Sequence, residues 1–214
     1  MSKEYNFYGR RLGRPLSPHK KGLVDTLLPA IEVSAETDWS TLPAPIRLEI
    51  GFGNGEHIAA QAKANPDITF VGAEPFLNGV ATLLGGIATE ELANIRLYPN
   101  DIRDLLPHIP DSTIDRIDML FPDPWPKKRH QKRRLAQTDL LHHLKRILKQ
   151  DGVFRFATDD DAYAEDILEY TKEAGFVQTK EDIHTPPADW VSTRYERRAI
   201  KLGNNRYFYC FRKV

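Results

Sequence analysis

The sequence predicts an α/β domain built on a mainly parallel sheet with helices on both faces. Three observations support this prediction. From residue 46 onward, short apolar runs alternate with segments of helical periodicity, and strands joined by helices run parallel through right-handed crossovers. The first apolar run ends in a glycine-rich turn, and acidic residues follow the ends of several runs. At 214 residues, a single domain over residues 1–214 is expected, with a substantial core.

The predicted elements follow one another in chain order. Residues 1–22 form a basic arm, punctuated by glycine and proline, that we expect to be flexible, and a short helix spans residues 22–31. Apolar runs predict strands at residues 46–50, 68–73, 94–98, 114–121 and 153–157, with two closing strands at Phe176 and at residues 207–211. Helical spacing of apolar residues predicts helices at residues 57–64, 76–88, 135–148 and 162–174.

Charge is unevenly distributed along a chain whose formal net charge is zero. Residues 1–21 carry six Lys and Arg against one acid, while many of the compensating acids lie within residues 158–182. A dipolar molecule of this kind presents one anion-attracting face. The sequence shows no His, Cys and carboxylate cluster at metal-ligand spacing, so we expect no metal.

The single cysteine, Cys210, excludes an internal disulfide and is expected to be a small core residue of a strand. No run approaches the length of a membrane span, and the N-terminus has no apolar signal-peptide core. We therefore expect a cytoplasmic protein with no membrane association. Nothing in the sequence requires a protein partner.

The first predicted strand ends in the turn Gly51-Phe52-Gly53-Asn54-Gly55. Glycines at alternate positions allow the backbone to turn tightly and to approach a ligand closely. The pattern is neither the GxGxxG fingerprint nor a P-loop, because no Lys-Ser/Thr pair opens the following helix. Glu49 at the head of the turn would repel a pyrophosphate but attract a cation, which points to S-adenosylmethionine. The alternative is a glycine-rich surface turn.

Three further carboxylates follow the ends of later strands. Glu74 ends the second strand, where a carboxylate can accept hydrogen bonds from both ribose hydroxyls. Asp101 follows the third strand, where it can accept a hydrogen bond from an adenine amino group, and Asp123 follows the fourth. Taken alone, Glu74 or Asp101 is better explained as a helix N-cap or a solvated loop residue. Together with Glu49, the four predict a ligand crevice at the carboxyl ends of the strands.

Residues 121–134 read FPDPWPKKRHQKRR and are the most distinctive part of the chain. Asp123 stands between two prolines beside Trp125, in a rigid turn that can hold a base. Trp125 either stacks on that base or fills the core beneath the turn. The basic run that follows can hold the phosphates of a nucleic acid. The alternative for the run alone is a solvated helix start.

Six segments together resemble the bacterial tRNA (guanine-N7-)-methyltransferases: LEIGFGNGEH, VGAEPF, NDIRDLL, FPDPWPKKRHQKRR, ATDDD and STRYERRAIKLGN, within residues 46–214. The resemblance implies a Rossmann-like class I methyltransferase fold with a seven-stranded sheet. It also implies S-adenosylmethionine as methyl donor and tRNA as partner and substrate, methylated at N7 of the variable-loop guanosine, position 46 in tRNA numbering.

The matching motifs also imply roles for individual residues. The cofactor would be bound by Glu49, Gly51, Gly53, Gly55, Glu74, Asp101 and Asp123. Asp123 would also serve catalysis. The substrate would be contacted by Lys127, Asp159, Thr193, Arg194, Tyr195 and Glu196, with residues 193–196 on a loop over the site, and the RNA by Arg129, His130, Gln131, Lys132, Arg133 and Arg134. The run ATDDD leaves Asp159 and Asp160 as alternatives, and the position directly after Thr158 favours Asp159.

Guanine N7 carries an in-plane lone pair and no proton, so its methylation needs no general base. The product is cationic, and a fixed carboxylate stabilises that charge, so Asp123 is predicted to orient the base and stabilise its charge. Two alternatives remain: a methyltransferase acting on an amino group of adenine or cytosine, and a non-enzymatic RNA-binding protein of the same fold. The order Pro-Asp-Pro-Trp and the basic run count against the first, and the four strand-end acids against the second.

Overall fold

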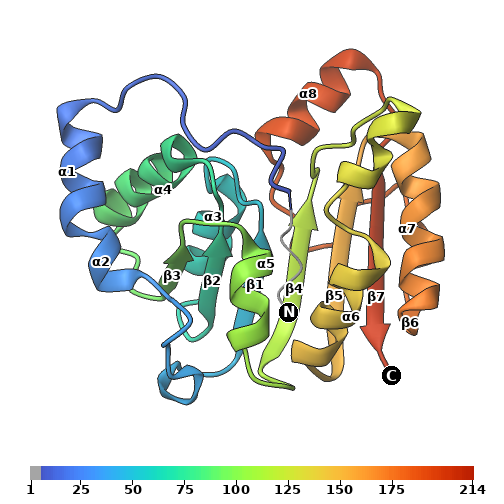
Figure 1. Cartoon of the computed structure of the whole chain (residues 1–214), viewed down its shortest axis with the longest axis horizontal. Helices are drawn as coiled ribbons and strands as arrows, with labels where there is room; N and C mark the ends of the chain where they lie inside the picture. The colour runs from blue at the N-terminus through green and yellow to red at the C-terminus, as the bar shows by residue number, and fades with distance from the viewer. Residues whose placement is uncertain (1–5) are drawn as a thin grey trace.

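The computed structural model describes residues 6–214, whose strands form one seven-stranded sheet in the order β3-β2-β1-β4-β5-β7-β6 (Figure 1). The strands are β1 (Ile46–Ile50), β2 (Thr69–Ala73), β3 (Ile95–Tyr98), β4 (Ile114–Leu120), β5 (Leu148–Thr158), β6 (Phe176–Gln178) and β7 (Tyr207–Lys213). The first five pair in parallel, and β7 lies antiparallel between β5 and β6. The predicted mainly parallel, seven-stranded sheet is confirmed.

Helices cover both faces of this sheet (Figure 1). One face packs against α5 (Ile102–Leu105), α6 (Thr138–Ile147) and α7 (Asp161–Glu173), and the other against α3 (Glu56–Ala64) and α4 (Leu77–Glu90). The remaining helices are α1 (Pro18–Thr26), α2 (Leu28–Ile31) and α8 (Arg194–Leu202), with short 3-10 turns at η1 (Trp39–Thr41), η2 (Leu106–His108) and η3 (Lys128–Arg133). No helix within residues 6–214 is long and apolar enough to cross a membrane.

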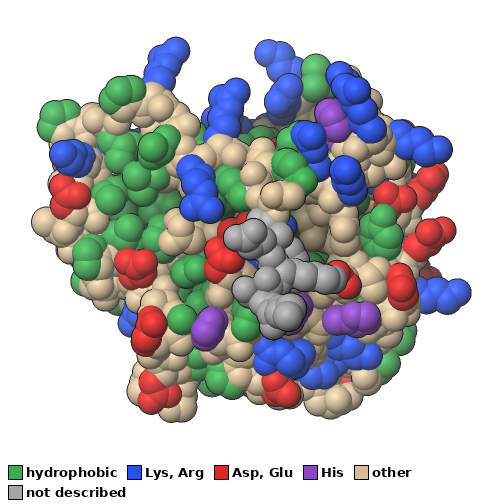
Figure 2. Space-filling model, in the orientation of Figure 1, with side chains coloured by type: hydrophobic (Ala, Val, Ile, Leu, Met, Phe, Trp, Pro, Cys, Tyr) green, Lys and Arg blue, Asp and Glu red, His purple; other side chains and the backbone are tan. Residues whose placement is uncertain are grey.

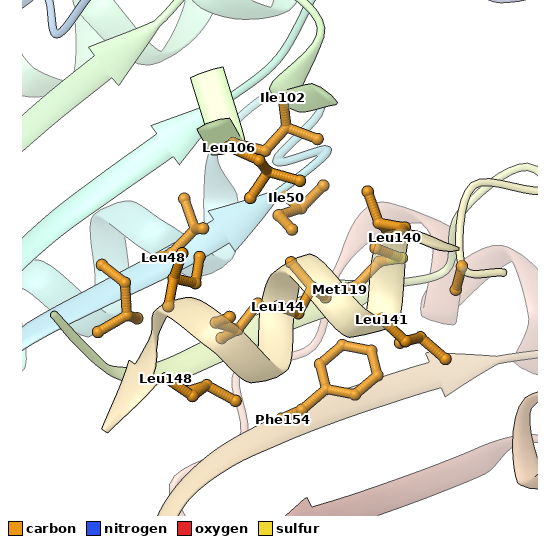
Figure 3. Packing of buried hydrophobic residues seen from close by; sticks show 14 of the residues in the cluster. Leu48, Ile50, Ile102, Leu106, Met119, Leu140, Leu141, Leu144, Leu148 and Phe154 are labelled. Carbon is orange, nitrogen blue, oxygen red and sulfur yellow. The ribbon is translucent and has the colours of Figure 1, made fainter. Parts of the chain in front are cut away.

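The larger core lies between α6 and the middle of the sheet (Figure 3). Leu140, Leu141 and Leu144 recur at helical spacing along α6, and all three are buried. They face alternate strand residues such as Leu48 and Phe154, which are fully buried. Because alternate residues of a strand point to the same face, this register fixes which side of the sheet is apolar.

The boundary between α6 and β5 differs from the prediction. α6 ends at Ile147, and β5 already begins at Leu148. The predicted turn at Asp151-Gly152 is a bulge within β5, where the register with β4 shifts and Asp151 has a φ of 62°. Cys210 lies in β7 as predicted, but it is half-buried rather than part of the core.

The predicted flexible arm is packed against α4 over its described part. Leu77 N donates to Arg11 O at 3.0 Å, and Gly13 N donates to Asn78 Oδ1 at 2.8 Å. Helix α1 already begins at Pro18, inside the segment predicted as an arm. Local composition does not reveal these contacts, because they join the arm to residues more than sixty positions away. Residues 1–5 of the predicted arm lie outside the described residues.

Candidate functional site

A cavity of about 550 Å³ opens at the carboxyl ends of the central strands. Glu74, Asp101 and Asp123 all line it, together with Gly51 and Gly53 of the glycine turn. The structure therefore brings together three of the four predicted carboxylates and the turn. The N-terminal segment also contributes to the wall, through Asn6, Phe7, Tyr8, Gly9 and Arg10, which sequence reasoning missed.

The glycine turn adopts a conformation that other residues rarely reach. Gly51, Gly53 and Gly55 have φ values of 74°, 59° and 82°, all in the left-handed region. Apart from Gly51 and its two chain neighbours, no atom of residues 6–214 lies within 4 Å of the position where a Gly51 side chain would begin. This stretch of backbone therefore has room for a ligand. The turn is held by Glu74, since Gly53 N donates to Glu74 Oε2 and Phe76 N to Glu74 Oε1, both at 2.9 Å.

The electrostatics of the cavity favour a cation beside Glu74. Burial raises the pKa of Glu74 above its ordinary value, and the neighbouring Asp123 raises it further. A positive group between the two carboxylates would relieve both effects. Asp101 differs, because its carboxylate caps α5 and forms an ion pair with Arg103 at 2.5 Å. Asp101 therefore carries a compensated charge, consistent with a neutral ligand group such as an amine of a base.

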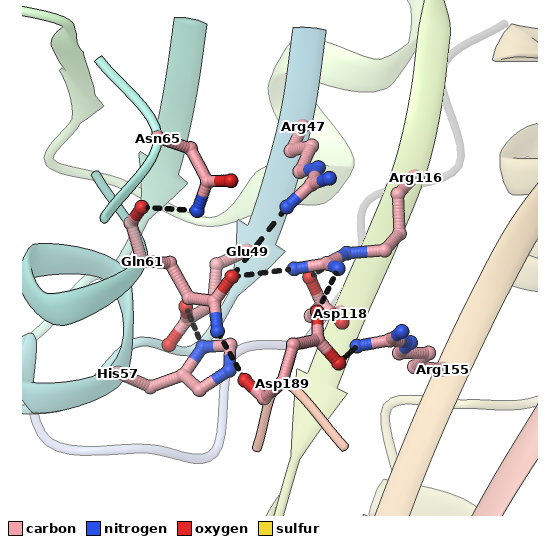
Figure 4. Close-up of polar contacts among 9 residues, drawn as sticks. All are labelled: Arg47, Glu49, His57, Gln61, Asn65, Arg116, Asp118, Arg155 and Asp189. Atoms are coloured by element: carbon pink, nitrogen blue, oxygen red, sulfur yellow. Dashed lines mark hydrogen bonds and ion pairs between the residues drawn. The ribbon is translucent and has the colours of Figure 1, made fainter. Parts of the chain in front are cut away.

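Glu49 is not among the residues that line this cavity, and its side chain lies beside His57 of α3 (Figure 4). Its Oε2 lies 2.7 Å from His57 Nδ1, and both side chains are buried. The two residues line a second cavity of about 30 Å³, room for one water molecule. Burial lowers the pKa of His57, but the Glu49 carboxylate outweighs this effect, so the pKa is raised overall.

A charged network that sequence reasoning missed continues from this region beneath β1 and β4 (Figure 4). Arg116 donates to Asp118 Oδ2 at 2.9 Å and to Asp189 Oδ2 at 2.8 Å, and Arg155 donates to Asp189 Oδ1 at 2.8 Å. The network ties the central strands to the segment that precedes α8. The sequence could have indicated this network, because Arg116 and Asp118 are charged residues at alternate positions of one strand. Alternate residues point to the same face of a sheet, so this pattern predicts a polar face.

The turn that carries Asp123 is strained on both sides. Phe121 and Trp125 have φ values of 52° and 46°, which non-glycine residues rarely adopt. Phe121 N donates to Ala157 O at 2.7 Å, and Arg134 Nε donates to Pro124 O at 2.7 Å. These bonds hold the turn so that the exposed Asp123 lines the cavity.

Trp125 lies at the wall of the cavity rather than in the core beneath the turn. The centroids of the Trp125 and Tyr8 rings lie 6.2 Å apart, and the Arg133 guanidinium lies 5.0 Å from the centroid of the Trp125 ring. Arg133 also lies 4.6 Å from the centre of the Tyr8 ring. The structure therefore rules out the core-filling alternative for Trp125 and leaves the ring beside the space where a base would enter.

Arg134 corrects the prediction that the whole basic run contacts RNA. Its side chain is 0% exposed and forms ion pairs with Asp160, at 3.0 Å, and with Asp166. Its guanidinium also lies 4.5 Å from the centre of the Tyr163 ring. Arg134 is therefore a structural residue. The run keeps four exposed cations, Lys127, Lys128, Arg129 and Lys132, with His130, Gln131 and Arg133 partly exposed.

Residues 193–196 were predicted on a loop, but they begin helix α8. Thr193 is the N-cap, accepting from Glu196 N at 3.1 Å. The Glu196 carboxylate is buried, where Trp190 Nε1 donates at 2.7 Å and Arg206 at 3.0 Å. Tyr195 lines both cavities, while Thr193 and Arg194 line only the small one.

The last two predicted substrate residues stand outside both cavities. Lys127 is exposed at the start of the basic run, and Asp159 Oδ2 accepts from Asn204 Nδ2 at 3.0 Å. Asp160 is engaged inside the protein, since it caps α7 through Tyr163 N and pairs with Arg134. Of the two alternatives in the acidic run, Asp160 is thus committed to structure. Within residues 6–214, no three His, Cys, Asp or Glu side chains are arranged as metal ligands.

Comparisons with known proteins agree with this arrangement. The sequence model of a family described as "Putative methyltransferase" matches residues 43–209. The tRNA (guanine-N(7)-)-methyltransferase of Agrobacterium fabrum is 42% identical, with 96% of this chain and 94% of the relative covered. The protein of the same description from Ruegeria sp. (strain TM1040) is 38% identical, over 97% of this chain and 88% of the relative.

Solved structures share the fold at low identity. The 16S rRNA methyltransferase KamB superposes with a TM-score of 0.60 at 14% identity, covering 82% of this chain and 89% of that chain. A 16S rRNA (adenine(1408)-N(1))-methyltransferase from Catenulisporales acidiphilia, solved with the cosubstrate SAM, gives 0.59 at 17% identity, covering 85% and 92%. The fold is therefore that of the class I methyltransferases.

Proposed function

We propose, since this chain belongs to the family of tRNA (guanine-N7-)-methyltransferases, that it methylates N7 of the variable-loop guanosine, position 46, of tRNA. The observation that carries the proposal is that the glycine turn, Glu74 and the Asp123 turn meet in one cavity. A cofactor held by the glycine turn would face a base held by Asp123. A tRNA substrate also favours the cytoplasm as the location of the protein.

The residues of the cavity fit S-adenosylmethionine. The open backbone at Gly51 allows close approach of a ligand. Each oxygen of Glu74 accepts one backbone N–H and keeps a second lone pair for a ribose hydroxyl. Glu74 and Asp123 together favour a positive group. When bound, S-adenosylmethionine supplies a methyl group on a positively charged sulfur.

The reaction moves one positive charge and no proton. With S-adenosylmethionine bound, the lone pair of guanine N7 would form the new N–C bond as the S–C bond broke, so that the positive charge would pass to the base and leave a neutral thioether. Asp123 can accept the N1–H and amino hydrogens of the guanine, which orients the base and stabilises its growing charge. The alignment of donor and acceptor supplies much of the remaining acceleration.

Nucleoside analysis by mass spectrometry tests the proposal. Unmodified tRNA incubated with the protein and S-adenosylmethionine should yield 7-methylguanosine, and a tRNA with adenosine at position 46 should not. N6-methyladenosine or a methylcytidine would instead show an amino-group methyltransferase. If calorimetry detected no binding of S-adenosylmethionine and the tRNA remained unmethylated after incubation, the protein would be a non-enzymatic RNA-binding protein.

The Asp123→Asn variant tests the catalytic role, because it preserves shape while removing the charge and part of the acceptor capacity. Turnover should fall by about 10²-fold or more, the usual effect of losing one preorganised electrostatic contact. Affinity for tRNA should change less, since phosphate contacts supply most of it. Wild-type turnover at saturating tRNA would reduce Asp123 to a turn residue.

A further inference from the structure

Helix α8 presents a basic face to solvent. Its nine residues include four cations and one acid, and the acid, Glu196, is turned inward and paired with Arg206. Arg194, Arg198 and Lys201 are exposed. Their i, i+4, i+7 spacing places them on one side of the helix over about 10 Å. Among residues 6–214 no salt bridge engages these three side chains.

The basic face sits on a rigid element. The helix starts at the Thr193 cap and stops at Gly203, whose φ is 71° and whose N–H donates to Ile200 O. The remaining cation of α8, Arg197, is paired with Glu56 of α3 at 3.0 Å, and Glu56 also accepts from the backbone N–H of Arg194. These contacts fix the direction in which the exposed cations point, so they form a surface rather than a mobile tail.

The helix that carries this surface borders the cavity. Tyr195 of α8 lines the cavity that Asp123 and Trp125 also line. A base inside the cavity brings its own and its neighbouring phosphates to the rim, where α8 stands. Figure 2 shows Lys and Arg side chains gathered along the upper edge of the molecule, in the region that α8 and the segment after β4 occupy in Figure 1. The exposed cations after β4 include Lys128, Arg129 and Lys132 of η3.

We propose that the outer face of α8, formed by Arg194, Arg198 and Lys201, binds backbone phosphates of the tRNA beside the cavity. This inference rests on the proposed function and adds a second basic segment to the run after Asp123. Because phosphates carry no sequence information, the face positions the RNA and does not select the base. An acidic protein surface would meet the same charges, but the position of α8 at the cavity rim favours RNA.

The double variant Arg198→Ala with Lys201→Ala tests the inference and leaves Arg194 in place. The dissociation constant of the tRNA complex is measured at several salt concentrations. Losing two phosphate contacts should reduce the slope of log affinity against log salt by about 1.4–1.8, at about 0.7–0.9 for each contact. Affinity for S-adenosylmethionine and turnover at saturating tRNA should stay at wild-type values.

The control removes two exposed cations away from α8, through Lys63→Ala and Lys172→Ala in the last turns of α3 and α7. Lys63 pairs with the exposed Glu90 at 2.9 Å, a surface contact that contributes little to stability. The salt slope of this control should equal that of the wild type. An unchanged slope in the α8 variant, or an equal loss in both variants, would overturn the inference. Failure of the proposed function is seen separately, as wild-type protein that forms no 7-methylguanosine while its tRNA binding is still measurable.

Discussion

The replacement of Arg134 by alanine tests how the Asp123 turn is held in place. The Arg134 guanidinium joins the turn, through Pro124 O, to Asp160 and Asp166 around α7, with its side chain wholly buried. Removing one partner of a buried ion pair typically costs about 3–5 kcal/mol. The carboxylates left behind are 18% and 30% exposed, so water can partly solvate them. We therefore expect Arg134→Ala to lower the free energy of unfolding by an amount near the lower limit of this range, about 3 kcal/mol.

Thermal and urea unfolding measure this loss. For a chain of this size, a change of 1 kcal/mol shifts Tm by about 2–4 °C, so Arg134→Ala should melt about 6–12 °C below the wild type. At a temperature where the variant is still folded, turnover should fall because Pro124 loses its donor and the Asp123 turn loosens. The salt dependence of tRNA binding should stay the same, because Arg134 cannot reach a phosphate.

Arg129 provides the matched control, since it belongs to the same basic run but is exposed. Arg129→Ala should leave stability within about 0.5 kcal/mol of the wild type and reduce the salt slope by about 0.7–0.9. Arg134→Lys keeps the charge without the planar donor set and should restore only part of the lost stability. A stable Arg134→Ala protein with a reduced salt slope would refute the reasoning and return Arg134 to the RNA-contacting residues.

Other positions give further expectations. Glu74→Gln should weaken S-adenosylmethionine by about 1.5–3 kcal/mol in calorimetry, the usual range for a hydrogen bond to a charged group; unchanged affinity would remove Glu74 from the site. Gly53→Ala should be destabilised by about 1–2 kcal/mol because of its left-handed φ, whereas Gly85→Ala, in the open interior of α4, should gain about 0.5–1 kcal/mol; equal melting temperatures would contradict this. The pKa of His57 is raised in the folded protein. The wild type should therefore have a higher free energy of unfolding than His57→Gln below pH 6.5, and this difference should disappear as the pH rises through the pKa of the folded state. Melting curves from about pH 6 to 9 should show this decline; a difference in stability that stays constant over this range would count against the Glu49 contact.

The sheet was predictable because its signal is local and repeated. The β1 run, Ile46–Ile50, and its glycine turn are both visible in the sequence, and the structure reproduces the strand without a shift. The start of β5 was missed because a bulge at Asp151 and Gly152 looks like the end of an element. Short helices such as α5 have too few residues to show a periodicity.

The sequence also contained a pattern that predicts the start of helix α8, but these residues were interpreted as a substrate-binding loop. Thr193 and Glu196 stand three positions apart, the spacing of a capping box, which marks the start of a helix. In the structure Thr193 accepts from Glu196 N, whereas the Glu196 side chain bonds to Trp190 and Arg206 instead of reaching back to the cap. A motif shared with a family can thus be retained for folding as well as for binding, and only burial separates the two.

The four strand-end acids show why the division of roles could not be read from sequence. Glu49, Glu74, Asp101 and Asp123 occupy equivalent positions in the pattern, yet their surroundings differ. Glu49 pairs with His57, Glu74 holds the glycine turn, and Asp101 is neutralised by its neighbouring arginine. Asp123 alone is exposed at the cavity, and it is held there by a strained turn. Asp123 has no hydrogen-bond or ion-pair partner among residues 6–214. In the proposed reaction its carboxylate is therefore available to stabilise the charge that develops on guanine. Its position depends on contacts from distant residues such as Arg134.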